Sequence, residues 1–120
     1  MLRPIPSRIL RSTANVFVCT GTDLYQNQTY DTYVVEHVHL QPTTEIRKST
    51  TNTDEQLSSV LFVDAKKSTP LLDWEGLLDS AHRAGGDVRV IVRDKEYTVL
   101  TVDALRDDTD NLHHYEVGLK

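Results

Sequence analysis

Two pairs of histidines are the residues whose type and spacing come closest to a metal site. His37 and His39 are two positions apart in a predicted strand, so both imidazoles lie on one face. Zinc needs a third and usually a fourth His, Cys, Asp or Glu ligand, and none converges on this pair in the sequence. His113 and His114 are adjacent in another predicted strand, so we expect their side chains to leave opposite faces. We therefore predict ordinary strand histidines and no metal site, with His37 and His39 as the only candidates.

Nucleophilic catalysis is not indicated by any motif. The single cysteine, Cys19, lies among valines and Phe17, where a buried thiol packs as a small apolar group. The chain contains neither a Gly-rich phosphate loop nor a Gly-x-Ser-x-Gly sequence. The carboxylates of residues 103–110 are typical of a solvated acidic turn. We predict no catalytic residue and no cofactor.

The charge balance argues against a general nucleic-acid binder. The chain has 120 residues and a net charge of −5, with 26% charged residues, whereas nucleic-acid-binding domains are usually basic. Arg47 and Lys48 are the exception, since they lie with Thr50 and Thr51 in the polar segment Thr43–Gln56, which we predict to be a long flexible loop. These four residues are candidates for contact with DNA or an acidic partner; an ordinary solvated loop is the alternative.

The elements that would position these residues are mostly strands. Alternating apolar residues predict six strands, and the length fits a single domain, residues 1–120. A small antiparallel β-barrel removes exposed strand edges at this size, so we expect a mainly β fold with one short helix. The predicted strands are Asn15–Thr20, Tyr30–Gln41, Leu57–Asp64, Asp87–Val92, Tyr97–Val102 and Leu112–Leu119.

The helix is expected as an insert over residues 70–84. Thr69 and Pro70 suggest an N-cap followed by proline at the first helical position. Trp74 and other apolar residues follow at helical spacing, which makes core packing the expected role of Trp74. Gly85 and Gly86 predict the helix end.

Finer features of the chain give three further expectations. In the second strand, strict alternation places Val34 and Val38 on one face. The hairpin around Asp94 and Lys95 should contain a turn different from the Asn-Gly type, or a bulge, because lysine is poor at positive φ. Residues 1–13 should form an extended N-terminal arm with side chains for docking on a neighbour, namely Pro4, Ile5, Pro6, Ile9 and Leu10.

The C-terminal segment contains a compact motif, whose residues are Leu112, His113, His114, Tyr115, Glu116, Gly118 and Leu119. This motif resembles the terminal motif of the minor capsid proteins of tailed bacteriophages and prophages. The run Leu61–Ala65 resembles the middle block of these proteins, and Val35–Thr43 resembles one of their strands, which ends in a polar turn.

This resemblance implies a non-enzymatic head-closure or head–tail connector subunit, made in the bacterial cytoplasm and located at the head–tail junction of the virion. Such subunits stack as a ring under the portal, and they can be monomers before they assemble. The implied partners are portal or adaptor-ring proteins, a tail-completion protein, further copies of the chain and, transiently, packaged DNA; the segment Thr43–Gln56 would be the channel loop. A tail-completion protein or a generic small β-barrel binding module is the alternative.

Overall fold

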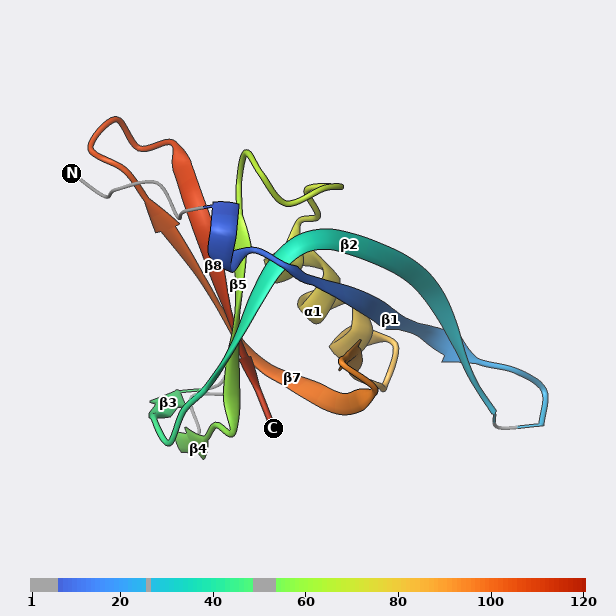
Figure 1. Cartoon of the computed structure of the whole chain (residues 1–120). Coiled ribbons are helices and arrows are strands. Elements are labelled where there is room, and N and C mark those ends of the chain that lie inside the picture. The colour runs from blue at the N-terminus through green and yellow to red at the C-terminus, as the bar shows by residue number, and fades with distance from the viewer. Residues whose placement is uncertain (1–6, 26, 49–53) are drawn as a thin grey trace.

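Six antiparallel strands close into a barrel in the computed structural model, which describes residues 7–25, 27–48 and 54–120 (Figure 1). The order around the barrel is β1-β2-β5-β8-β7-β6. The mainly β class and the six-stranded closed sheet were both predicted from the sequence. The barrel strands are β1 (Ser12–Thr22), β2 (Gln28–Pro42), β5 (Ser59–Asp64), β6 (Val88–Val92), β7 (Lys95–Arg106) and β8 (Leu112–Leu119). The other elements are η1 (Ser7–Ile9), β3 (Ile46–Lys48), β4 (Asp54–Gln56) and α1 (Trp74–Arg83).

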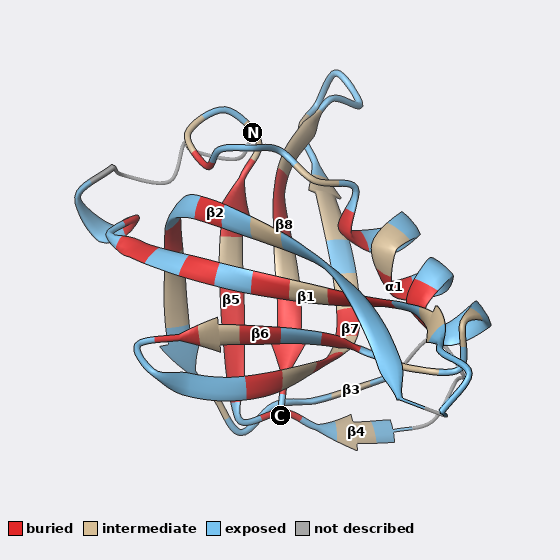
Figure 2. Ribbon diagram, turned by 90° about the vertical axis from the view of Figure 1, so that its right-hand side faces the viewer, coloured by how far each residue is buried: buried red, intermediate tan, exposed pale blue. Residues whose placement is uncertain are grey.

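The barrel interior is filled by alternate residues of these strands (Figure 2). Each strand contributes valine, leucine or tyrosine to one face, as the period-two patterns predict. Cys19 is buried as well, as expected. Buried side chains of the strands include Val16, Val18, Leu61, Val63, Val88, Val90, Val92, Tyr97, Val99, Tyr115, Val117 and Leu119.

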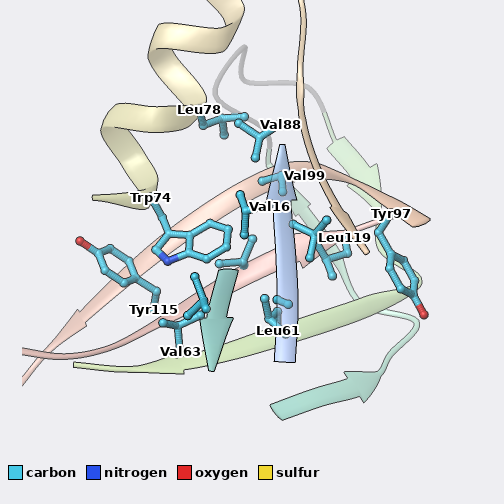
Figure 3. Close-up of a cluster of buried hydrophobic side chains, with 14 of the residues drawn as sticks. Val16, Leu61, Val63, Trp74, Leu78, Val88, Tyr97, Val99, Tyr115 and Leu119 are labelled. Carbon is cyan, nitrogen blue, oxygen red and sulfur yellow. The ribbon is translucent and has the colours of Figure 1, made fainter. Parts of the chain in front are cut away.

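Helix α1 packs on the barrel through Trp74, Leu78 and Ala81, all buried. The Trp74 ring lies beside Tyr115 and Val63 (Figure 3), so its predicted core role is confirmed. Among the described residues, no helix is long and apolar enough to cross a membrane.

The start of α1 differs from the prediction. Asp73 is the N-cap, and its carboxylate accepts a hydrogen bond from the Gly76 N–H at 3.2 Å. Thr69 cannot serve as the cap, because its backbone forms a bridge with Glu36 through hydrogen bonds of 2.8 and 3.2 Å. The end of the helix agrees with the prediction: Gly85 follows the C-cap with a φ of 82°.

A β-bulge in β2 overturns the predicted alternation of that strand. Val35 pairs opposite Ala14 and Val38 opposite Ser12, so two residues of β2, Glu36 and His37, lie opposite a single residue of β1. His37 absorbs the additional residue with a φ of 61°. Val35 and Val38 therefore both point inward, whereas Val34 is 49% exposed.

The β6–β7 hairpin turns one residue earlier than predicted. Arg93 and Asp94 both have positive φ, 52° and 64°, and Lys95 already pairs with Val92. This is a two-residue turn of the kind that matches strand twist. The two positive-φ positions fall on Arg93 and Asp94, so lysine is not needed at positive φ. The turn thus differs from an Asn-Gly turn, as expected, and the pairing of β6 with β7 shows no bulge.

The N-terminal segment is only partly the predicted extended arm. Residues 7–9 form the short 3-10 turn η1, and β1 begins at Ser12. Leu10 is buried, while Ile9 is exposed. Leu10 thus belongs to the core of its own chain, and Pro4, Ile5 and Pro6 lie outside the described residues.

Candidate functional site: a hairpin fixed to the barrel wall

The segment predicted to be a long flexible loop contains a two-stranded hairpin (Figure 1). Strand β3 pairs with β4 in the register Ile46 to Gln56, Arg47 to Glu55 and Lys48 to Asp54. Two backbone hydrogen bonds join the base of this β3–β4 hairpin: Thr43 N–H donates to Ser58 at 3.0 Å, and Leu57 N–H donates to Glu45 at 2.9 Å. The hairpin therefore continues the ladder of β2 and β5.

Arg47 fixes the hairpin against the barrel. Its Nη1 lies 2.9 Å from Asp103 Oδ2 on β7, and its Nη2 lies 3.0 Å from Glu116 Oε1 on β8. The same Nη2 lies 2.7 Å from Glu45 Oε2 beside the hairpin. One guanidinium thus joins three carboxylates from separate parts of the chain, which its planar set of five donors permits.

The electrostatics of this cluster favour the charged forms. Partial burial alone would lower the pKa of Arg47, but hydrogen bonds and charge from Glu45 and Glu116 outweigh burial and raise it. Partial burial alone would raise the pKa of Glu116, but hydrogen bonds from His114 and Arg47 outweigh burial and lower it. The Arg47 and Glu116 side chains are only 20% and 18% exposed, so solvent screens this ion pair less than a surface pair.

The two adjacent histidines contact each other, which corrects the expectation that they leave opposite faces. His113 Nδ1 lies 2.7 Å from His114 Nδ1, and His114 Nε2 lies 3.0 Å from Glu116 Oε2. The rings meet edge to face, with centroids 5.0 Å apart. His113 is next to the first residue of β8, where a register irregularity at Leu105 and Arg106 interrupts regular pairing with β7. Regular alternation therefore does not determine its ring position.

The rings of the other histidine pair, His37 and His39, have different surroundings. His37 is the exposed bulge residue, and His39 packs its ring on Phe62 at 5.8 Å. Within the ranges that the structure describes, no three His, Cys, Asp or Glu side chains converge as a metal site would require.

Of the remaining channel-loop candidates, the structure describes Lys48 but not Thr50 and Thr51. Lys48 Nζ lies 3.3 Å from Asp54 Oδ1 in a solvent-exposed pair. Thr50 and Thr51 lie outside the described residues. Both described cations of the hairpin are thus paired with carboxylates.

Comparison with known proteins identifies the family. A family model described as "Minor capsid protein" matches residues 6–119. The chain belongs to the minor capsid protein family. No curated protein and no solved structure matches it. The match covers nearly the whole chain, so barrel, helix and hairpin all belong to this minor capsid protein unit.

The C-terminal motif of this minor capsid protein combines core and hairpin contacts. Tyr115 and Leu119 are buried in the barrel, and Glu116 holds Arg47. A Cβ added at Gly118 would collide with the Thr101 hydroxyl and the Leu57 side chain, so only glycine fits there. Leu112 packs against the core at the other end of β8.

Sequence reasoning missed both the partners of Arg47 and an exposed apolar tip. Asp103 and Glu116 lie 56 and 69 positions from Arg47 and carry no local signal. Leu24 and Tyr25 lie at the turn between β1 and β2 and are 95% and 84% exposed. Two adjacent apolar residues inside a polar turn were the available signal.

Proposed function

We propose that this minor capsid protein is a head-closure or head–tail connector subunit that stacks as a ring under the portal, retains DNA and helps attach the tail. Membership of the minor capsid family supports a structural role in a phage particle. The observation that carries the finer proposal is the β3–β4 hairpin, which extends from a closed barrel and is fixed to β7 and β8 by Arg47.

A fixed hairpin suits a channel element for a physical reason. The ion pairs to Asp103 and Glu116 restrict the hairpin to one orientation relative to the barrel. Its cations are neutralised by carboxylates, and the chain as a whole is acidic. Such a surface does not hold DNA phosphates tightly, so DNA can move past it. The hairpin can then narrow the channel and retain DNA sterically, without acting as a DNA-binding site. The proposed activity is mechanical and non-enzymatic.

The proposed partners follow from this position. One side of the ring would contact the portal or adaptor ring, and the other would contact a tail-completion protein. Locating the labelled protein in purified particles, with mass spectrometry of separated heads and tails, tests this directly. We expect signal at the neck and on DNA-filled heads. Signal confined to free tails would instead indicate the tail-completion alternative, and absence from particles would overturn a virion role.

The role of the hairpin is tested by replacing Ile46–Gln56 with a short Gly-Asn-Gly turn. We expect the barrel to fold and the resulting heads to leak DNA or fail to join tails. The matched control shortens the turn between β7 and β8, residues 107–110. This turn lies at one end of β7 and β8, and the β3–β4 hairpin lies toward their other end (Figure 1). Normal infectious particles from the hairpin variant would contradict a channel role.

A further inference from the structure

Strands β1 and β2 continue beyond the barrel as a two-stranded arm, described over residues 20–25 and 27–29 (Figure 1). Strand β1 pairs with β6 over Ala14–Val18, and β2 pairs with β5 from Val38 onward. The two strands pair with each other as far as Thr22 and Gln28. The outer part of this arm is therefore held by its own ladder and is exposed on both faces.

Hydrogen bonds join the described residues Asp23, Tyr25 and Asn27 at the tip of the arm. Asp23 Oδ1 accepts hydrogen bonds from the N–H groups of Tyr25 at 2.8 Å and Asn27 at 3.0 Å. The Asp23 N–H also donates to the Asn27 carbonyl at 2.8 Å. These bonds hold the backbone that carries the exposed Leu24 and Tyr25 side chains. Because the backbone is already held in place, Leu24 and Tyr25 lose less conformational entropy on binding than they would on a flexible loop. This favours a role for the two side chains as contact residues.

The outer wall of the barrel provides a groove of matching chemistry. It is lined by Phe17, Tyr30, Arg89, Ile91 and Glu96 and has a volume of about 180 Å³. Ligand pockets usually measure about 300–1,000 Å³, so this groove suits a side chain better than a small molecule. Its apolar and aromatic groups can receive Leu24 or Tyr25.

The tip cannot reach the groove of its own chain. The groove residue nearest the tip is Tyr30, which pairs with Cys19; Leu24 is five positions beyond Cys19, a span of at most roughly 16 Å at the rise of a β-strand. The paired arm runs away from the barrel, so its tip is available only to another molecule (Figure 1).

Charge favours a second copy of this chain as that molecule. The tip carries one charged side chain, the Asp23 carboxylate, beside Leu24 and Tyr25, and residues 19–32 contain no lysine or arginine. The groove contains Arg89, which forms a 3.4 Å pair with Glu96; the two side chains are 45% and 55% exposed. The exposed guanidinium of Arg89 can therefore pair with Asp23 of an incoming tip while the apolar groove residues receive Leu24 or Tyr25, and one chain carries both halves.

We propose that the Leu24–Tyr25 tip of one subunit docks into the Phe17–Ile91 groove of the next copy. The two surfaces differ, so the contact is heterologous and closes into a ring when the rotation permits. This inference rests on the proposed function insofar as that function needs a ring, and it specifies the contact that forms the ring.

The first test measures self-association of the purified chain by sedimentation velocity, up to about 1 mM so that a dissociation constant in that range is detected. We expect concentration-dependent association that weakens about tenfold or more in L24S/Y25S and in I91E, as for central contact residues. The matched control is Leu71→Ser, because Leu71 is also an exposed leucine but lies outside both surfaces. A wild-type chain that stays monomeric, or association unchanged in both variants, would overturn the proposal.

A complementation test distinguishes this contact from a symmetric one. The L24S/Y25S chain keeps its groove, and the I91E chain keeps its tip. Mixing the two should restore a one-to-one heterodimer, because one intact tip and one intact groove remain. Failure of the mixture to associate would exclude the tip-in-groove contact. These measurements use no particles: a failed contact leaves neck localisation unaffected, and a successful one survives even if the protein is absent from the neck.

Discussion

At the residue scale, Arg47 and Glu116 determine how the β3–β4 hairpin is attached. Both side chains are partly buried, and replacing Arg47 by alanine leaves the Glu116 carboxylate without the guanidinium that pairs with it. We expect R47A to lower the free energy of unfolding by about 1–2 kcal/mol, measured by urea denaturation. A double-mutant cycle with E116A should show coupling between the two. The control K48A removes an exposed pair and should change stability by about 0.5 kcal/mol or less; equal losses in R47A and K48A would contradict the anchoring role.

The lowered pKa of Glu116 predicts an acid-sensitive contribution to stability. The pKa of Glu116 is lower in the folded chain than its ordinary value of 4.5, so the ionised carboxylate stabilises the fold at pH values above 4.5. This stabilisation is lost as the pH falls through the folded pKa. The difference in free energy of unfolding between wild type and E116Q should therefore shrink below pH 4.5. Denaturation at several pH values measures it. Asp107 also has a lowered pKa, caused by hydrogen bonds from Thr109 and Asn111, but it is unchanged in both chains and cancels in this difference.

At the element scale, the position of the helix N-cap separates local from tertiary signals. Sequence periodicity predicts one apolar helix face of Leu71, Trp74, Leu78 and Ala81. Trp74, Leu78 and Ala81 are the buried face of α1, whereas Leu71 precedes the helix and is 50% exposed. The local Thr69-Pro70 pattern predicts the N-cap at Thr69, which is wrong. The backbone of Thr69 instead forms a bridge with the distant Glu36, and no local sequence pattern indicates this bridge. The same limit applies to the bulge at His37, which exchanges the faces of β2.

Asp73 should therefore contribute more to stability than Thr69. We expect D73A to cost about 1 kcal/mol, the usual effect of losing an N-cap, because the Gly76 N–H loses its acceptor. T69A removes an exposed side chain and should change stability by about 0.5 kcal/mol or less. Thermal or urea denaturation of both variants checks this, and a larger loss in T69A would argue for the earlier cap.

At the scale of the whole molecule, the charge distribution predicts weak binding to DNA. The net charge is −5, and the described hairpin cations are paired with carboxylates. Fluorescence anisotropy with labelled duplex DNA at physiological salt should give a dissociation constant above about 10⁻⁴ M, weaker than ordinary non-specific binding. The control D54K/E55K adds cations to the same hairpin and should bind more tightly. Wild-type binding in the micromolar range would contradict a channel surface that lets DNA pass.

Local patterns in the chain were enough to predict the six barrel strands, the closed-barrel class, the buried residues of α1 and the resemblance of the C-terminal motif. These features depend on periodicity and short motifs, which local residues carry. The β3–β4 hairpin, the helix start, the inward residues of β2, the partners of Arg47 and the contact between His113 and His114 became known from the folded chain alone. Bulges, bridges and ion pairs join residues far apart in the chain or depend on the neighbouring strand. Their geometry exists only once the barrel has closed.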